Sequence, residues 1–167
     1  PRVPGLTDDA FVHDGKMTKR EVRAITLAHL MPHPGALLWD VGLGCGSIAI
    51  EWMRSARGAK AIGLEPNAER RSLASENALA LGVPGLDIRD TSAPDGLAGL
   101  PAPDAIFIGG GLTADGIVDA CHDALKDGGR LVANAVTLES EALLAHWHQQ
   151  AGGELMRLEL ANAALIG

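Results

Sequence analysis

The sequence has 167 residues, of which 47% are hydrophobic, and this composition is that of one globular domain able to bury its own core. The formal net charge is -7 and there is no basic run, so neither a nucleic acid nor an anionic membrane surface is expected as a partner. No stretch is apolar enough to span a bilayer, and Cys45 and Cys121 lack the spacing of a redox or metal-binding pair. We therefore expect a cytoplasmic domain and, because the chain begins with Pro1, a segment excised from a longer protein.

The first part of the chain, residues 1–35, is expected to form an irregular N-terminal arm followed by one helix. Thr18, with Glu21 three residues later, has the pattern of a capping box and predicts a helix over 19–30. The core is expected to cover 36–167, and we interpret both parts as one single domain.

Apolar runs and amphipathic segments alternate through the rest of the chain. Strands are expected over 37–41, 61–64, 86–89, 105–108, 130–135 and 155–160, and helices over 48–57, 68–81, 116–125 and 139–150. Apolar strands that alternate with helices form a parallel sheet covered on both faces. The predicted fold class is therefore α/β, with a doubly wound, mainly parallel sheet.

In such a sheet, ligands bind beyond the carboxyl ends of the strands, where the strand order reverses. This rule places the candidate site residues on one edge, at positions 40–47, 65, 90–93, 109–111 and 134–137. We expect the activity of the domain to be located along this edge.

Three glycines at alternate positions, Gly42, Gly44 and Gly46, follow the first strand. Without Cβ atoms, such a turn lets the main chain lie against a ligand, and Ser47 begins a helix whose free amide groups face the same place. The third glycine of a dinucleotide-binding motif would fall on Ser47, and Asp40 provides a carboxylate suited to a sulfonium ligand that carries an amino group. S-adenosylmethionine is therefore favoured over NAD, with a glycine turn that binds no ligand as the alternative.

Two further strand ends suggest contacts with a nucleoside. Glu65 ends the second strand where a carboxylate accepts hydrogen bonds from ribose hydroxyls, and the alternative is a solvated acid in front of a helix. Ser92 and Ala93 follow the third strand and are candidates for an adenine pocket. Asp90 is a competing candidate there, and an ordinary polar loop is the alternative.

Gly109 and Gly110 leave a bare backbone after the fourth strand, where a substrate would enter. An Asn/Asp-Pro-Pro-aromatic element is absent at this position and the chain has no tyrosine, which argues against methylation of nucleic-acid bases. The histidines lack ligand spacing and there is no Gly-x-Ser-x-Gly motif, so neither a metal site nor a serine nucleophile is expected. The densest basic group is Lys16, Lys19, Arg20 and Arg23, for which a solvated helix face is the alternative interpretation.

Six stretches spread over nearly the whole chain resemble one family of enzymes. They are residues 4–11, 17–23, 39–47, 93–95, 106–111 and 132–139. The glycine turn is shared by many class I S-adenosylmethionine-dependent methyltransferases. The N-terminal arm and the Asn-Ala-Val-Thr-Leu-Glu segment that starts at Asn134 are similar to the decarboxylating precorrin-6Y and precorrin-6B C15-methyltransferase family of cobalamin biosynthesis.

This resemblance implies a Rossmann-like class I fold that binds S-adenosyl-L-methionine and releases S-adenosyl-L-homocysteine. It implies methylation of a polycarboxylate tetrapyrrole, a precorrin, at C15 with decarboxylation of the ring C acetate. It further implies a homotetramer and a fused N-terminal tetrapyrrole methylase domain. Positions that match the family's cofactor contacts are Thr18, Gly42, Leu43, Gly44, Cys45, Gly46, Glu65 and Ala93; the strand-end argument adds Asp40, Ser47, Ser92, Gly109 and Gly110. No catalytic residue is assigned, and Lys19 and Arg23 are suggested to orient the acetate carboxylate.

The chain departs from the family in two places. Thr91-Ser92-Ala93 replaces the usual Gly-Asp-Ala, which argues against an acidic adenine contact. After residue 160 the family runs through a basic loop into a last strand, whereas this chain stops at residue 167, so we expect the final strand to be missing. Three alternatives remain: a class I methyltransferase for another small molecule or a protein side chain, a nicotinamide-binding Rossmann domain, and a non-catalytic cofactor-binding module.

Overall fold

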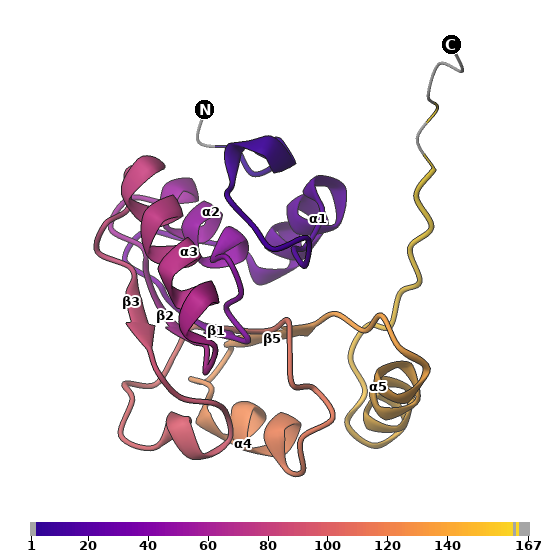
Figure 1. Cartoon of the computed structure of the whole chain (residues 1–167). Helices are drawn as coiled ribbons and strands as arrows, with labels where there is room; N and C mark the ends of the chain where they lie inside the picture. The colour runs from indigo at the N-terminus through magenta and orange to yellow at the C-terminus, as the bar shows by residue number, and fades with distance from the viewer. Residues whose placement is uncertain (1–2, 162, 164–167) are drawn as a thin grey trace.

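A five-stranded, all-parallel sheet forms the centre of the computed structural model, which describes residues 3–161 and 163 (Figure 1). The strands are β1 (Leu37–Val41), β2 (Lys60–Leu64), β3 (Asp87–Arg89), β4 (Ala105–Ile108) and β5 (Arg130–Ala133). Their order in the sheet is β3-β2-β1-β4-β5. The predicted α/β class with a parallel sheet is confirmed.

Helices cover both faces of this sheet. They are α1 (Arg20–Leu30), α2 (Ser47–Ser55), α3 (Ala68–Ala80), α4 (Ile117–Ala124) and α5 (Leu138–Ala151), with short 3-10 turns η1 (Asp8–Ala10) and η2 (Asp95–Leu97). Figure 1 shows α1, α2 and α3 on one face and α4 on the other. The two faces have separate hydrophobic cores, so the domain is doubly wound as expected.

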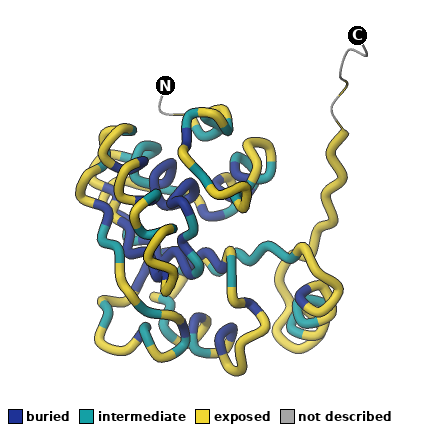
Figure 2. The backbone as a smooth tube through the Cα atoms, in the orientation of Figure 1, coloured by how far each residue is buried: buried dark blue, intermediate teal, exposed yellow. Residues whose placement is uncertain are grey.

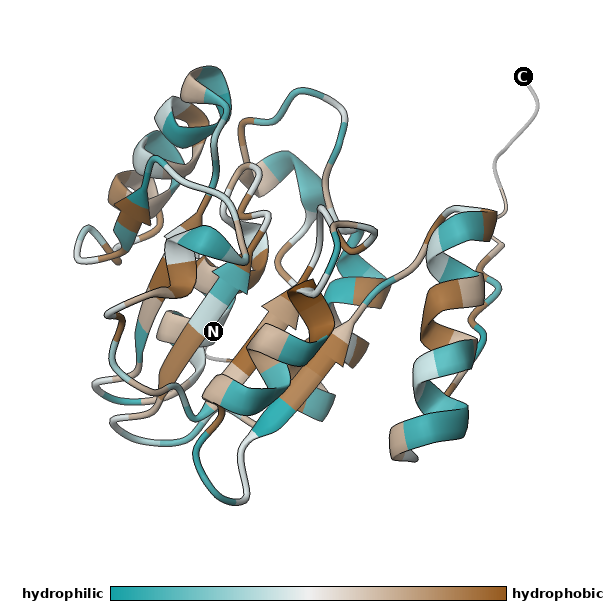
Figure 3. Ribbon diagram, turned by 90° about the horizontal axis from the view of Figure 1, so that it is seen from below, coloured by the Kyte–Doolittle hydropathy of each residue, from teal (hydrophilic) through white to brown (hydrophobic). Residues whose placement is uncertain are grey.

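The central strands are buried on both faces, and the edge strands are not (Figure 2). All of β4 is buried, which explains its continuous apolar sequence Ala-Ile-Phe-Ile. Figure 3 shows the same concentration of hydrophobic residues in the strands, coloured brown. The chain proceeds outward from β1 through β2 to β3, and then returns to β4 beside β1. The carboxyl ends of β1 and β4 are therefore the point where the strand order reverses, which is where ligands bind in this fold class.

The predicted capping box at Thr18 is wrong. Helix α1 begins at Arg20, its N-cap is Lys19, and no side chain caps it. Glu21 is therefore the second helical residue, one position too early to reach back to the N-cap backbone. A complete capping box instead joins Thr137 and Ser140 at the start of α5.

The predicted strand over 155–160 is also wrong. These residues are extended but make no strand ladder, and Leu155, Met156, Leu158 and Leu160 are all exposed. An alternating apolar pattern forms a strand only where a neighbouring strand supplies hydrogen bonds, and within the described part of the chain the segment runs away from the sheet (Figure 1). The expected absence of a final strand concerns the last residues, of which 162 and 164–167 lie outside the described residues.

Candidate functional site

The turn after β1 has a backbone conformation that requires glycine. The φ angles of Gly42, Gly44 and Gly46 are 77°, 57° and 83°, in the left-handed region. The turn is fixed to the neighbouring strand because the amide of Gly42 donates to the carbonyl of Leu64 at 3.1 Å. Helix α2 begins at Ser47 directly after it, one residue before the predicted start at 48, and its N-cap is Gly46. The free amide groups of this helix start therefore face the same edge of the sheet.

Leu43 and Cys45 lie in the same turn, but their side chains are not exposed to solvent. Both residues are buried. The side chain of Leu43 covers Gly63, where an added Cβ would lie 2.5 Å from a Leu43 methyl carbon. Burial raises the pKa of the Cys45 thiol, so a thiolate is disfavoured. These two residues can offer only their main chain to a ligand.

The segment after β4 lies directly against the glycine turn. A Cβ built on Gly42 would come within 2.6 Å of the amide nitrogen of Gly110. The amide of Gly109 donates to the carbonyl of Val41 at 2.9 Å. Because Val41 is paired with Ile108 in the register of β1 and β4, both strands end at the same level. The structure thus brings together two bare backbone segments that are far apart in the sequence.

Asp40 is a buried carboxyl group with one unused oxygen. Its Oδ2 accepts a hydrogen bond from the Ala49 amide at 3.1 Å, whereas Oδ1 has no partner. Burial, with a smaller contribution from the charge of Glu65, raises the pKa of Asp40 to about 8. A buried acceptor without a partner is costly, and a cationic donor beside it would remove that cost.

Glu65 lies at the glycine turn and is buried, which excludes the alternative of a solvated acid. Its Oε2 accepts from the Gly44 amide at 2.9 Å, and its Oε1 accepts from the Asn67 amide at 3.0 Å. The carboxylate is therefore held by two main-chain donors beside the turn. Asn67 in turn caps helix α3 by accepting from the Arg70 amide.

The residues considered for an adenine pocket differ in their accessibility. Ala93 is buried, whereas Ser92 is exposed and its carbonyl accepts from the Gly96 amide. The competing candidate Asp90 is engaged, because its carboxylate pairs with Arg71 at 2.8 Å. Arg71 also donates to the carbonyl of Glu65 at 2.9 Å, so one guanidinium joins the ends of β2 and β3. Of these three residues, Ala93 alone is both buried and apolar.

Arg23 does not fit its suggested role toward a substrate carboxylate. It is fully buried, and its Nε donates to Glu51 at 2.6 Å. Its other nitrogens donate to Asp8 and to the carbonyls of Leu6 and Thr18. With these donors engaged inside the protein, Arg23 fixes the N-terminal arm and is unavailable to a ligand.

The Lys19 side chain remains accessible to solvent, whereas Thr18 contributes its main-chain carbonyl to the hydrogen bonds that hold the arm. The Lys19 side chain is 56% exposed and lies 3.9 Å from Asp8, a contact that leaves it free to pair with another carboxylate. Thr18 is half-buried and its carbonyl is used by Arg23. Lys16 lies nearer to the glycine turn, since its carbonyl is 4.0 Å from the position of a Cβ on Gly44.

Glu51 and Asn77 are two buried polar residues that the sequence analysis missed. Glu51 accepts from Arg23 and from the amides of Gly5 and Leu6, which fixes the beginning of the arm. Asn77 binds Val12 of the arm. The available signal was a polar residue at a position where the helix periodicity places it among small or apolar buried residues.

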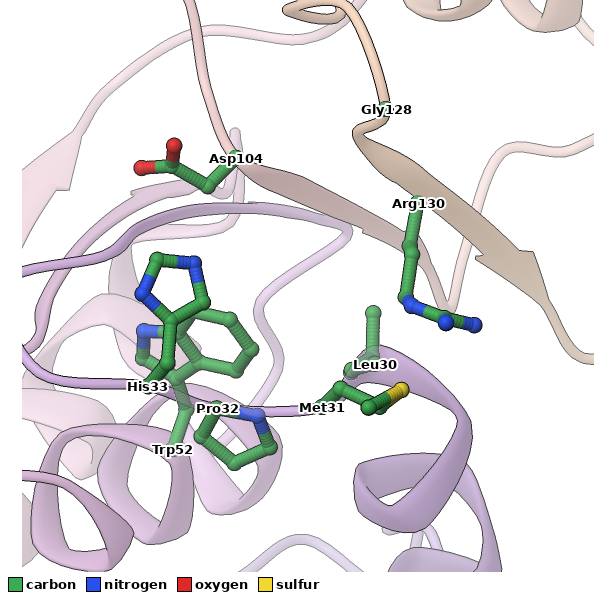
Figure 4. A pocket seen from close by; sticks show the side chains of 8 residues that line it. All are labelled: Leu30, Met31, Pro32, His33, Trp52, Asp104, Gly128 and Arg130. Atoms are coloured by element: carbon green, nitrogen blue, oxygen red, sulfur yellow. The ribbon is translucent and has the colours of Figure 1, made fainter.

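A surface hollow of about 330 Å³ lies elsewhere in the fold, and Figure 4 shows the side chains that line it. It is lined by Leu30, Met31, Pro32, His33, Trp52, Asp104, Gly128 and Arg130. Arg130 begins β5 and Asp104 precedes β4, so the hollow lies at the amino ends of the strands. Among the described residues, the buried side-chain atoms without a partner are Trp39 Nε1 and Asp40 Oδ1, and neither belongs to the lining. No buried, unpaired side-chain atom therefore lines the hollow, in contrast to the edge that holds Asp40.

Within residues 3–161 and 163, no cluster of three or more His, Cys, Asp or Glu side chains could hold a metal ion. No helix in that part of the chain is long and apolar enough to cross a membrane.

The parallel sheet, the glycine turn and the acidic residue at the next strand end together define a Rossmann-like methyltransferase domain of class I. Residues 9–167 match the family described as precorrin methyltransferase domain, and the chain belongs to this family.

Relatives of the chain carry consistent names. Over its whole length it is 53% identical to the precorrin-6Y C(5,15)-methyltransferase (decarboxylating) of Sinorhizobium sp., of which it spans 40%. It is 35% identical over 143 residues to the probable cobalt-precorrin-6B C(15)-methyltransferase (decarboxylating) of Pyrobaculum calidifontis, covering 83% of this chain and 73% of that protein. The crystal structure of the C-terminal domain of precorrin-6Y C5,15-methyltransferase from Rhodobacter capsulatus has a TM-score of 0.92 at 45% identity, covering 100% of this chain and 90% of that one.

Proposed function

We propose that this domain methylates a precorrin at C15, with S-adenosylmethionine as the methyl donor, and releases the ring C acetate carboxyl as carbon dioxide, a step of cobalamin biosynthesis. The observation that carries the proposal is the contact of the glycine turn with both Glu65 and Gly110, in a chain that belongs to the precorrin methyltransferase domain family. The names of its relatives support the substrate and the decarboxylation.

The residues at this edge fit S-adenosylmethionine, which supplies an electrophilic methyl group when bound. The unpaired Oδ1 of Asp40 suits the cationic amino group of its methionine part. The side-chain-free positions Gly42 and Gly44 suit close contact with its main body. Glu65 suits the ribose hydroxyls, and Ala93 suits the adenine ring.

The protein's own contribution to the reaction is positioning. The electron-rich meso carbon of a precorrin needs no deprotonation before methylation, so orientation of the two reactants supplies most of the acceleration. Gly109 and Gly110 pack against Phe107 and Gly42, and this segment is the main chain proposed to lie beside the macrocycle. Lys19, exposed on the arm, orients the acetate carboxylate, while the buried Arg23 holds the arm in place.

We further propose that residues 1–167 form one domain of a longer protein with a fused N-terminal tetrapyrrole methylase domain. The 40% share of the Sinorhizobium protein that the chain spans supports this arrangement. The proposal includes a homotetramer, which the family resemblance implies. It also includes a cytoplasmic location, which the lack of a redox cysteine pair favours.

The decisive experiment is a mass measurement of the product. The purified chain, the precorrin substrate and S-adenosylmethionine should give a product with one methyl group gained and one carbon dioxide lost. Methyl gain without loss of carbon dioxide would contradict the decarboxylase activity. Calorimetric titration with S-adenosylhomocysteine and with NAD addresses the alternatives, because a nicotinamide-binding domain would bind only the second.

A further inference from the structure

One buried side chain ties the N-terminal arm to the glycine turn. Asn77, on helix α3, is only 2% exposed. Its Oδ1 accepts from the Val12 amide at 2.8 Å, and its Nδ2 donates to the Val12 carbonyl at 2.8 Å. The same Nδ2 donates its second hydrogen to the carbonyl of Cys45 at 3.0 Å. One amide group thus binds both main-chain groups of an arm residue and one carbonyl of the glycine turn.

The arm continues from Val12 along the turn. Asp14 pairs with Arg70 of α3 at 2.9 Å, and two residues later the carbonyl of Lys16 lies 4.0 Å from the position of a Cβ on Gly44. The Asp14 pair is partly exposed and joins the arm to α3 alone. Asn77 differs because its hydrogen bonds reach the arm and the glycine turn at once.

We propose that Asn77 is a positioning residue that holds the N-terminal arm against the glycine turn, and thereby sets the affinity of the domain for its nucleoside cofactor. The inference rests on the proposed function, in which this turn holds S-adenosylmethionine. In this proposal the residue acts through the main chain of Cys45.

An amide is the side chain that this position requires. It must accept one hydrogen bond and donate two, which a carboxylate, a hydroxyl or an apolar group of similar size cannot do. Asn77→Asp retains the acceptor for Val12 but replaces both donors, so that a carboxylate oxygen faces two carbonyl groups. The buried carbonyl of Cys45 is then left without its partner, which is costly inside a protein.

The test is calorimetric titration of the full chain with S-adenosylhomocysteine, comparing wild type, Asn77→Asp and Asn77→Ala. We expect both variants to bind at least about tenfold more weakly than wild type. A matched control is Val118→Ala, which removes buried volume from α4 in the other core and touches neither arm nor turn. It should lower stability while changing the affinity by less than about twofold.

Two further measurements separate positioning from a general loss of structure. In the free protein, hydrogen exchange should accelerate in residues 12–18 and 42–47 of both Asn77 variants, and in neither segment of the Val118→Ala control. In steady-state assays, KM for S-adenosylmethionine should rise with little change in kcat. If wild type binds S-adenosylhomocysteine and the Asn77 variants bind it equally well, this inference alone fails. If wild type does not bind it, the proposed function fails as well.

Discussion

Gly42 and Gly110 approach each other so closely that a Cβ on the first would lie 2.6 Å from the amide nitrogen of the second. The two residues are far apart in the sequence, and they follow the neighbouring strands β1 and β4. Two glycine segments with separate expected roles, one for the cofactor and one for the substrate, therefore form a single continuous wall. The absence of a side chain at Gly42 is therefore a requirement of packing, in addition to the role proposed for it in cofactor binding.

The first prediction concerns Gly42→Ala. The added methyl group would collide with the Gly110 backbone and would also strain a φ angle of 77°, so we expect the free energy of unfolding to fall by about 2–3 kcal/mol. Binding of S-adenosylhomocysteine should be lost. Urea denaturation and calorimetry measure the two effects. Gly82→Ala is the control, because its φ is 81° with no atom within 4 Å of the added Cβ, and it should show the strain without the loss of binding.

A second prediction addresses Glu65→Gln. Replacing the carboxylate removes the charged acceptor proposed for the ribose hydroxyls, and we expect S-adenosylhomocysteine to bind about tenfold to a hundredfold more weakly. Calorimetric titration measures this change. Glu69→Gln, at an exposed position in the first turn of α3, is the matched control and should bind as wild type does. Equal affinity of wild type and Glu65→Gln would show that Glu65 does not bind the ribose.

The third prediction concerns the pH dependence of stability. The pKa of Asp40 is about 8 in the folded protein, mainly because of burial, against 3.8 for an unperturbed aspartate. Between these values the folded state binds a proton that the unfolded state has released, so this group makes the free energy of unfolding fall as pH rises through the interval. Asp40→Asn keeps an acceptor for the Ala49 amide and removes the ionisation. Wild type should therefore lose stability relative to Asp40→Asn between about pH 5 and pH 8 in urea titrations; parallel pH profiles would contradict the assignment.

A fourth prediction follows from the same carboxyl group. If the ammonium group of the ligand lies beside Asp40, it favours the ionised carboxylate, lowers its pKa and releases a proton on binding. Titrations with S-adenosylhomocysteine near pH 7, in buffers of different ionisation enthalpy, should reveal this proton. The Asp40→Asn variant should release none, and equal proton release by both proteins would place the ammonium group elsewhere.

Much of this fold could be predicted because buried parallel strands are recognisable in a sequence as short apolar runs between amphipathic helices. Strands β1 and β4 were predicted with their observed bounds. The strand-end rule then placed Asp40, Glu65 and Gly110 on one edge without further information, because all carboxyl ends of a parallel sheet share that edge. Those parts of the site that follow from topology were therefore accessible from the sequence.

The remaining features depend on partners that are distant in the sequence. Arg23 and Lys19 are both cations of the same segment, and the sequence does not distinguish them. In the structure Arg23 is buried and pairs with Glu51 of another helix, whereas Lys19 is exposed. The same holds for Asn77, whose partners lie on the arm and in the glycine turn. The segment 155–160 has the sequence pattern of a strand but does not form one, because no neighbouring strand supplies hydrogen bonds to it.

The last prediction separates the two cations that the sequence could not distinguish. Arg23→Met leaves the buried carboxylate of Glu51 without its charged partner, so we expect the free energy of unfolding to fall by about 3–5 kcal/mol. Lys19→Met removes only an exposed contact with Asp8 and should cost less than about 1 kcal/mol. Decarboxylation should show the opposite dependence, with Lys19→Met stable but slow and with Arg23→Met active in proportion to its folded fraction. Adding Glu51→Gln to Arg23→Met should restore part of the stability, because it removes the unpaired charge. If urea denaturation shows no recovery, the arm is held by the hydrogen bonds of Arg23 to Leu6 and Thr18 rather than by the ion pair.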